Sequence, residues 1–312
     1  MNHHILDLDQ QREELYPIFQ KMRDGNTILF LGAGASVGEK KYLSKELIEL
    51  YEDKIGKKID EKDITKWIDI LSADTSFKRT HFDSYVNDTL KKLTITEGHK
   101  ILASIPWRQI ITTNYDLLVE QAFDAIADSP DKIYELKPIK SKKEYYYRES
   151  NSEVKYIKLN GSIDDRSKYP LAFSSDDFEK LKPFYKVVLN DLRNISPDID
   201  FISIGYSYAD DFGQDLLKKF DVYNYRDKKW IIHVDPFPNM NALPYYTQNR
   251  IRIVKLSFSD FFEEFKKWET YHSETLSRRK GLCVKSCKNI RLQVSPKLLL
   301  NMEGYSISTE FQ

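Results

Sequence analysis

The stretch Thr27-Ile-Leu-Phe-Leu-Gly-Ala-Gly-Ala-Ser36 decides the fold of this chain. Its first five residues form an apolar run that is too short for most helices and is bounded by Gly25 and Gly32. This pattern predicts a strand that is buried on both faces, as in a parallel sheet. The small residues after it predict a turn where backbone N–H groups can approach a phosphate. Because Val37 stands where a dinucleotide fingerprint has its third glycine, the motif alone also fits a structural turn.

Strand and helix patterns alternate along most of the chain. Further strands are predicted at 109–114, 154–159, 200–205, 230–234 and 251–256, and helices at 8–24, 43–51, 117–123, 176–193, 211–221 and 258–268. This alternation predicts an α/β fold, a Rossmann-like doubly wound parallel sheet that binds ligands beyond the carboxyl ends of its strands. Short amphipathic stretches over about 57–104 predict a small helical insertion, and 132–152 a surface excursion with a short strand.

The composition limits the classes of protein that the chain can belong to. Its 312 residues are 41% hydrophobic, which excludes a disordered chain. Lysine plus arginine and aspartate plus glutamate both number 48, so direct binding to nucleic acid is not expected from the overall charge. No apolar run has the length of a membrane span, and the start lacks the pattern of a signal peptide. We therefore expect no membrane association and a cytoplasmic location.

The last part of the chain differs from the body. Residues 1–270 are predicted to form the main domain, and residues 271–312 a C-terminal extension with seven basic and three acidic side chains. Such a basic extension suits assembly, or it packs as a hairpin against its own domain. Cys283 and Cys287 are the only cysteines, two short of a four-cysteine zinc site, so no metal is expected. The pair could still be redox-active or join ligands from another chain.

Four motifs occur in a specific order: Gly32-Ala-Gly-Ala-Ser36, Thr112-Thr-Asn-Tyr-Asp116, Lys158-Leu-Asn-Gly-Ser-Ile163 and Gly205-Tyr-Ser-Tyr-Ala-Asp210. Their order and spacing resemble the sirtuin-like (SIR2-like) NAD-binding fold over about residues 20–270. The Thr-Thr-Asn-Tyr-Asp version resembles the bacterial NAD hydrolases of antiphage defence more than the protein deacylases. The zinc-binding cysteines common among sirtuin deacylases are missing, which ranks deacylation last.

The resemblance implies roles for particular residues. It implies that the first and last motifs contact the nucleotide through Gly32, Ala33, Gly34, Ser36, Gly205, Tyr206 and Ser207. It implies a catalytic role for Asn114, whose carboxamide can donate and accept hydrogen bonds beside the anomeric carbon as nicotinamide departs. Alternatively, Asn114 caps the following helix. Asp116 either caps that helix or supports the ribose site, and Asp235 either contacts the adenosine ribose or begins a turn before Pro236.

The most important departure from the family pattern is Asn160. The family has a histidine in this motif, acting as a general base near the ribose hydroxyls, and an amide has no usable basicity at neutral pH. Three explanations remain: a substitution that traps bound nucleotide, a natural protein that works without the base, or a domain that binds nucleotide without cleaving it. Among the six histidines, His81 in the helical insertion is the candidate for a replacement base.

The resemblance implies an NAD hydrolase that converts NAD, its substrate, to nicotinamide and ADP-ribose in antiphage defence. Because unrestrained turnover would be toxic, control by homo-oligomerisation and by a separate partner is expected. The resemblance points to an ATPase of the HerA type or to a nucleic-acid-sensing defence protein. The alternative is a catalytically weakened sensor or assembly subunit, in which NAD or ADP-ribose stabilises one assembly state. Asn160 is the best support for that alternative.

Overall fold

The computed structural model describes residues 5–6, 12–36, 42–129, 134–146, 152–193, 199–208, 213, 231–239, 241 and 243–273. The chain divides into two compact units, residues 1–265 and 266–312. The sheet and the candidate site belong to the first unit. The cysteine pair, Asp210 and most of the helix predicted at 211–221 lie outside the described residues.

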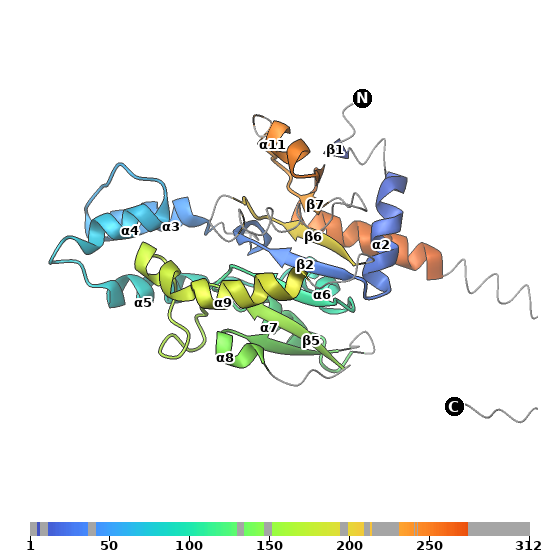
Figure 1. Cartoon of the computed structure of the whole chain (residues 1–312), viewed down its shortest axis with the longest axis horizontal. Coiled ribbons are helices and arrows are strands. Elements are labelled where there is room, and N and C mark those ends of the chain that lie inside the picture. Colours follow the sequence, from blue (N-terminus) through green and yellow to red (C-terminus); the bar gives the residue numbers. More distant parts are fainter. Residues whose placement is uncertain are drawn as a thin grey trace, which may run out of the picture. The chain divides into compact units, whose positions relative to one another are not determined.

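An eight-stranded parallel sheet forms the centre of the first unit (Figure 1). Its order is β1-β8-β7-β6-β2-β3-β5-β4. The strands are β1 (Ile5–Leu6), β2 (Thr27–Leu31), β3 (Gln109–Thr112), β4 (Glu135–Ile139), β5 (Glu153–Lys158), β6 (Asp200–Ile204), β7 (Ile231–Val234) and β8 (Ile251–Val254). All five residues of β2 are buried, because β2 lies inside the sheet and both of its faces are covered. The fold is thus the Rossmann-like α/β class that the sequence predicts.

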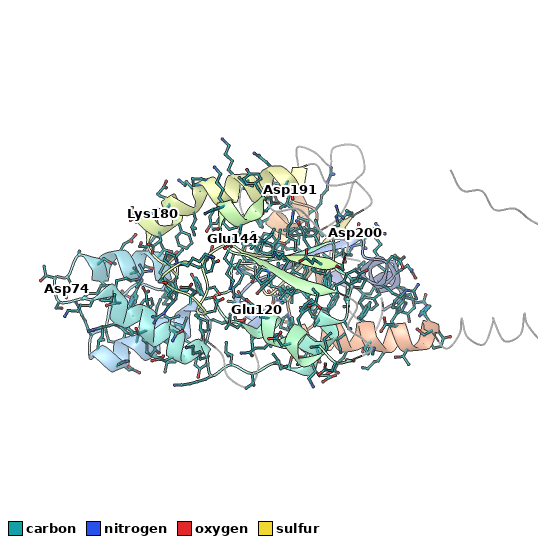
Figure 2. All side chains as sticks on the ribbon, turned by 90° about the horizontal axis from the view of Figure 1, so that it is seen from below. Asp74, Glu120, Glu144, Lys180, Asp191 and Asp200 are labelled. Atoms are coloured by element: carbon teal, nitrogen blue, oxygen red, sulfur yellow. The ribbon has the colours of Figure 1, made fainter. Side chains whose placement is uncertain are left out.

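Helices cover both faces of the sheet. The long helix α9 (Ser175–Arg193) packs its apolar side chains, among them Val188, against Phe30 and Ile157 on one face. Figure 2 shows Asp191 of α9 on one side of the strands and Glu120 of α7 (Leu118–Ala125) on the other. The other helical elements of this unit are η1 (Arg12–Leu15), α2 (Tyr16–Arg23), α8 (Lys142–Tyr145), α11 (Leu243–Gln248) and residues 258–265.

Helices connect β2 to β3 in the region that includes the predicted insertion. They are α3 (Ser44–Ile55), α4 (Ile64–Ser72), α5 (Arg79–Leu90) and α6 (Glu97–Ala103), of which the last three lie within 57–104. Figure 1 shows α3, α4 and α5 grouped together. These helices form an apolar core of their own, separate from that of the sheet, with Tyr51, Trp67 and Phe82. Phe173, from the loop before α9, packs into the same core. The insertion is therefore tied to the residues that follow β5.

The strand register places the predicted site residues at one edge of the sheet. Leu31 pairs with both Thr112 and Ile204, Thr112 with Lys158, and Ile204 with Val234. Since all these strands are parallel, the chain leaves each of them on the same side. The first two residues after these pairs include Gly32, Ala33, Asn114, Asn160, Gly205, Tyr206 and Asp235. None of the described helices has the length and apolarity that a bilayer span requires.

Candidate functional site

The glycine turn after β2 packs directly against the turn after β6. A Cβ atom built on Gly32 would lie 2.4 Å from the Gly205 carbonyl oxygen, and one on Gly34 would lie 2.7 Å from the Gly205 Cα. Gly205 itself has φ +64°, a left-handed conformation that favours glycine. These glycines are therefore required for contact between the two turns, a reason that the sequence alone does not supply.

The same contact occupies most of the backbone donors of the turn. The N–H groups of Gly32 and Gly34 donate to the carbonyls of Ile204 and Gly205, both at 3.0 Å. The turn continues as a short 3-10 helix, η2 (Ala33–Ser36), in which the Ala35 N–H donates to the Gly32 carbonyl at 2.9 Å. Among residues 32–35, Ala33 alone has an N–H group without an acceptor in the described part of the chain. A phosphate here would meet fewer free donors than the motif suggests.

The Asn114 carboxamide lies against this turn. Its Nδ2 donates to the Gly32 carbonyl at 2.9 Å and to Ser36 Oγ at 2.8 Å. The Asn114 backbone N–H donates to Thr112 Oγ1 at 3.0 Å, which fixes the start of the loop. Within the described residues no group donates to Asn114 Oδ1. Both amide protons are thus committed, and a hydrogen-bond acceptor remains available on a half-buried side chain.

Asp116 makes hydrogen bonds to the start of a helix and to the glycine turn. Its Oδ1 accepts from the Leu118 N–H at 3.0 Å, at the beginning of α7. Its Oδ2 accepts from Ser36 Oγ at 2.6 Å, and that hydroxyl oxygen in turn accepts from Asn114. The carboxylate is buried. Asp116 therefore caps the first N–H of α7 and also orients the hydroxyl that holds Asn114, while no backbone N–H of α7 donates to the Asn114 side chain.

The Asn160 amide is bonded through its oxygen, whereas the Asn114 amide is bonded through its nitrogen. Its Oδ1 accepts from the hydroxyl of Tyr185 on α9 at 2.7 Å, and the side chain is buried. Its backbone carbonyl accepts from the Ala172 N–H at 2.9 Å. Within the described residues Nδ2 of Asn160 has no acceptor. Tyr185 is a residue of the candidate site that sequence reasoning missed, because only the fold brings α9 over this loop.

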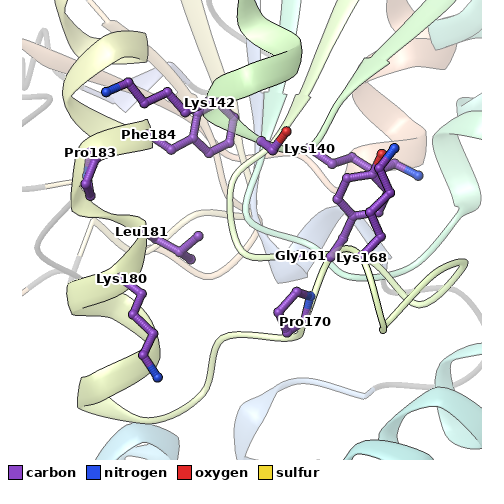
Figure 3. Close-up of a pocket in the computed structure, with 11 residues that line it drawn as sticks. Lys140, Lys142, Gly161, Lys168, Pro170, Lys180, Leu181, Pro183 and Phe184 are labelled. Atoms are coloured by element: carbon purple, nitrogen blue, oxygen red, sulfur yellow. The ribbon is translucent and has the colours of Figure 1, made fainter.

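A cavity of about 220 Å³ lies beside the residue after Asn160 (Figure 3). Gly161 and Lys140 line one side of it, and Leu181 and Phe184 of α9 line the other. Lys140 pairs with Asp164. Burial alone would raise the pKa of Asp164, but the hydrogen bond from Lys140 and the charges of Lys140 and Lys158 lower that pKa to about 2. The carboxylate is ionised at neutral pH and balances the lysine.

The turn after β7 contains Asp235. Its Oδ1 accepts from the Phe237 N–H at 2.9 Å, so the turn-beginning role is present. Its Oδ2 lies 3.8 Å from Nε2 of His233. Burial by itself raises the pKa of Asp235, yet His233 and the Phe237 N–H outweigh it and bring the pKa below its ordinary value. The ionised carboxylate is 31% exposed and can accept further hydrogen bonds.

A buried hydrogen-bond chain orients His233. The Tyr208 hydroxyl donates to Ser203 Oγ at 2.5 Å, and Ser203 Oγ lies 2.8 Å from Nδ1 of His233. Because Ser203 accepts from Tyr208, its own proton is free for Nδ1, which leaves the ring proton on Nε2, toward Asp235. His233 is a core residue.

The other two predicted residues of the turn after β6, Tyr206 and Ser207, differ in exposure. The Tyr206 ring is buried, with its centroid 4.4 Å from that of Phe30, so only its backbone is placed for a ligand. Ser207 is exposed.

His99, and not His81, lies near the Asn114 cluster. His81 is exposed on α5. His99 is 3% exposed, and its Nδ1 accepts from the Thr96 N–H at 3.1 Å. Burial lowers the pKa of His99 to about 4, and the opposing effects come from Asp116 and the backbone of Ala35. His99 is thus neutral at pH 7 and carries its proton on Nε2. Its position before an apolar helical segment gave no sequence signal for this contact.

Within the described residues, no group of three or more histidine, cysteine, aspartate or glutamate side chains gathers as a metal site would require. The candidate site is therefore built from amides, hydroxyls, one buried carboxylate and the backbone.

Comparison with known proteins shows a similarity to one family. Residues 108–253 match the family model of the SIR2-like domain. The chain is similar to the SIR2-like domain over this segment. The matched segment includes Asn114, Asn160, Gly205 and Asp235, and the glycine turn at Gly32 precedes it.

Three proteins named NAD(+) hydrolase ThsA are similar to this chain. The one from Enterococcus faecium is 28% identical over 271 residues, which are 83% of this chain and 50% of that protein. The one from Bacillus cereus (strain MSX-D12) is 27% identical over 197 residues, 61% of this chain and 39% of that protein. The one from Cytobacillus dafuensis is 26% identical over 218 residues, with shares of 68% and 41%. The chain spans half or less of the length of these curated relatives.

Proposed function

We propose that this chain is an NAD hydrolase that releases nicotinamide and ADP-ribose from NAD. The observation that carries the proposal is the position of Asn114, whose amide protons are bonded to Gly32 and Ser36 while its Oδ1 remains open. The resemblance of the four motifs to the SIR2-like fold implies that this turn contacts the nicotinamide-side ribose. The names of the similar proteins support the same substrate.

The chemistry follows from the acceptor on Asn114. When the bond between nicotinamide and ribose breaks, C1′ becomes cationic, and the neutral nicotinamide leaves. Water adds to C1′ and one proton is released, so NAD and water give nicotinamide, ADP-ribose and a proton. Asn114 Oδ1 accepts a hydrogen bond from that water or from a ribose hydroxyl and so holds it beside C1′. Positioning of this kind lowers the barrier without a strong base.

Asn160 contributes differently from a histidine. Since Tyr185 donates to its Oδ1, the amide presents Nδ2, a donor, to the site. A donor can hold a ribose oxygen but cannot take a proton from it. We therefore propose slow hydrolysis that depends on Asn114, with the adenosine side held by Asp235 and the backbone of the Gly205 turn.

The biological setting belongs to the same proposal. We place the chain in the cytoplasm of a bacterium, as a toxic effector of antiphage defence. Control comes from homo-oligomerisation and from a partner, an ATPase of the HerA type or a nucleic-acid-sensing protein, with residues 271–312 as the docking element. The four sequence motifs support this setting.

A second function, nucleotide sensing without turnover, is favoured by Asn160 alone. In that case NAD or ADP-ribose binds the same site, and the ligand favours one assembly state.

The test measures nicotinamide released from NAD by chromatography, together with NAD affinity by calorimetry. The wild-type chain releases nicotinamide, and Asn114→Ala lowers that rate about 100- to 1,000-fold, the usual loss for one preorganised polar group at a reacting centre. Asn87→Ala is the matched control, because it removes another buried amide, on α5. Tight NAD binding without release in every variant would favour the sensor.

A further inference from the structure

A lysine is buried beneath the loop that carries Asn114. Lys158 is the last residue of β5, and its side chain is 0% exposed. Lysine is almost never fully buried unless it is paired, because desolvation of an ammonium group is costly. The full burial of the Lys158 ammonium therefore needs an explanation, and its contacts provide one.

The Lys158 ammonium holds the backbone of the loop at residues 114–116, which carries Asn114. Its Nζ donates to the carbonyl of Asp116 and, at 3.4 Å, to the carbonyl of Tyr115. These two carbonyls belong to the peptide planes on either side of the Asp116 Cα. Because both planes are fixed, the direction of the Asp116 side chain is fixed as well. Its carboxylate then meets Ser36, which holds Asn114.

The counter-charge lies outside that loop. Lys158 Nζ is 3.1 Å from Oε1 of Glu120 on α7. Burial raises the pKa of Glu120, and Lys158 acts against that rise. A buried ion pair is often no more stabilising than two apolar side chains of the same volume. A contribution to stability therefore does not explain why a charged pair is buried here. The hydrogen bonds from Lys158 to the two loop carbonyls do explain it.

The same strand provides an internal comparison. Lys155 is also buried, but its Nζ lies 3.8 Å from Asp191 of α9, on the opposite face of the sheet from Glu120 (Figure 2). This follows from the alternation of side chains along a strand, since the two lysines are an odd number of residues apart. None of the hydrogen bonds to the 114–116 loop described above comes from Lys155.

We propose that Lys158 is a positioning residue for the hydrolysis of NAD, acting through Asp116 and Ser36 on the Asn114 carboxamide. The inference rests on the proposed function, since the step that it serves is nicotinamide release. It predicts that the charge on Lys158 affects kcat much more than the KM for NAD, because the glycine turn and the Gly205 turn remain intact.

The experiment compares four variants for nicotinamide release and thermal unfolding. Lys158→Met lowers both kcat and Tm, because Glu120 is left buried without its partner. Lys158→Met with Glu120→Leu removes both charges, so Tm returns close to that of the wild type while kcat stays about 10-fold low, because Lys158 acts through the Ser36 hydroxyl that holds Asn114. Glu120→Gln keeps the lysine on both carbonyls and lowers Tm with kcat near the wild-type value. Lys155→Met, the matched control, leaves kcat unchanged.

Two results overturn the inference in distinguishable ways. If the double variant recovers kcat together with Tm, or if kcat follows Tm equally in Lys158→Met and Glu120→Gln, then Lys158 serves stability alone and the NAD hydrolase proposal survives. If the wild-type chain itself releases no nicotinamide, the proposed function fails and the inference fails with it. The Lys158→Met and Glu120→Gln comparison holds below the Tm of both, even where the double variant does not fold.

Discussion

Asn114 and Asn160 occupy equivalent places on neighbouring strands but present opposite chemistry. Each lies two residues beyond the paired residues Thr112 and Lys158. Asn114 has its nitrogen bonded and its oxygen open, whereas Asn160 has its oxygen bonded to Tyr185 and its nitrogen open. Two identical side chains thus become an acceptor and a donor through their partners alone. Water activation is therefore assigned to the Asn114 loop.

The largest expected effect comes from making the second loop an acceptor as well. Asn160→His introduces a base where the family has one, and we expect nicotinamide release to rise by roughly 100-fold or more. Because a histidine base acts only when neutral, the gain should appear as pH rises through about 6.5, the ordinary pKa of histidine. Rates at pH 5.5 and 7.5 measure it. A variant no faster than the wild type would contradict a catalytic position for residue 160.

The next effect is a pH dependence of the free energy of unfolding, which arises from the protonation of His99 near the Asn114 loop. Its pKa is about 4 in the folded chain and about 6.5 when unfolded. The unfolded state therefore binds more protons between these values, and stability is full above pH 6.5 and falls as pH drops toward 4. Between pH 7.5 and 5.0 the loss from His99 is about 2 kcal/mol.

Urea unfolding of the wild type and of His99→Gln at both pH values measures this contribution. The variant should lack the 2 kcal/mol difference, and His81→Gln, which changes an exposed histidine, should keep it. An equal pH dependence in wild type and His99→Gln would show that His99 does not stay neutral on folding.

A smaller effect is expected for the hydroxyl between Asp116 and Asn114. Ser36→Ala removes an acceptor for one Asn114 proton and a donor to Asp116. The Gly32 carbonyl still holds the amide, so we expect nicotinamide release to fall only about 10-fold, or about 1.4 kcal/mol. Ser76→Ala, at an exposed hydroxyl in the loop after α4, is the control. A Ser36→Ala rate equal to the wild type would remove Ser36 from the account.

The smallest effect concerns the single bond on the Asn160 side. Tyr185→Phe deletes the donor to Oδ1 of a buried amide, which lowers the free energy of unfolding by about 1 kcal/mol. Nicotinamide release should change by less than it does in Ser36→Ala, because Asn160 only donates. If Tyr185→Phe lost more activity than Ser36→Ala, the Asn160 loop would matter more for catalysis than the Asn114 loop, which contradicts the account.

Much of the fold follows from local sequence, and the site follows in part. The apolar run at 27–31 predicts β2 without error, because a strand that is buried on both faces leaves no alternation to misread. The two-residue strand β1 has too few residues for a pattern. The motifs identify Asn114, but its partners Gly32 and Ser36 are about 80 residues away. Similarly, Tyr185, His99 and the role of Lys158 depend on tertiary packing that no spacing encodes.

The central claim is tested most directly by a crystal structure of the chain with a non-hydrolysable NAD analogue. The account predicts that Asn114 Oδ1 lies about 3 Å from a ribose hydroxyl, or from a water that faces C1′, while Nδ2 keeps its bonds to Gly32 and Ser36. A nicotinamide ribose bound away from Asn114, or an amide turned so that Nδ2 faces the sugar, would contradict it.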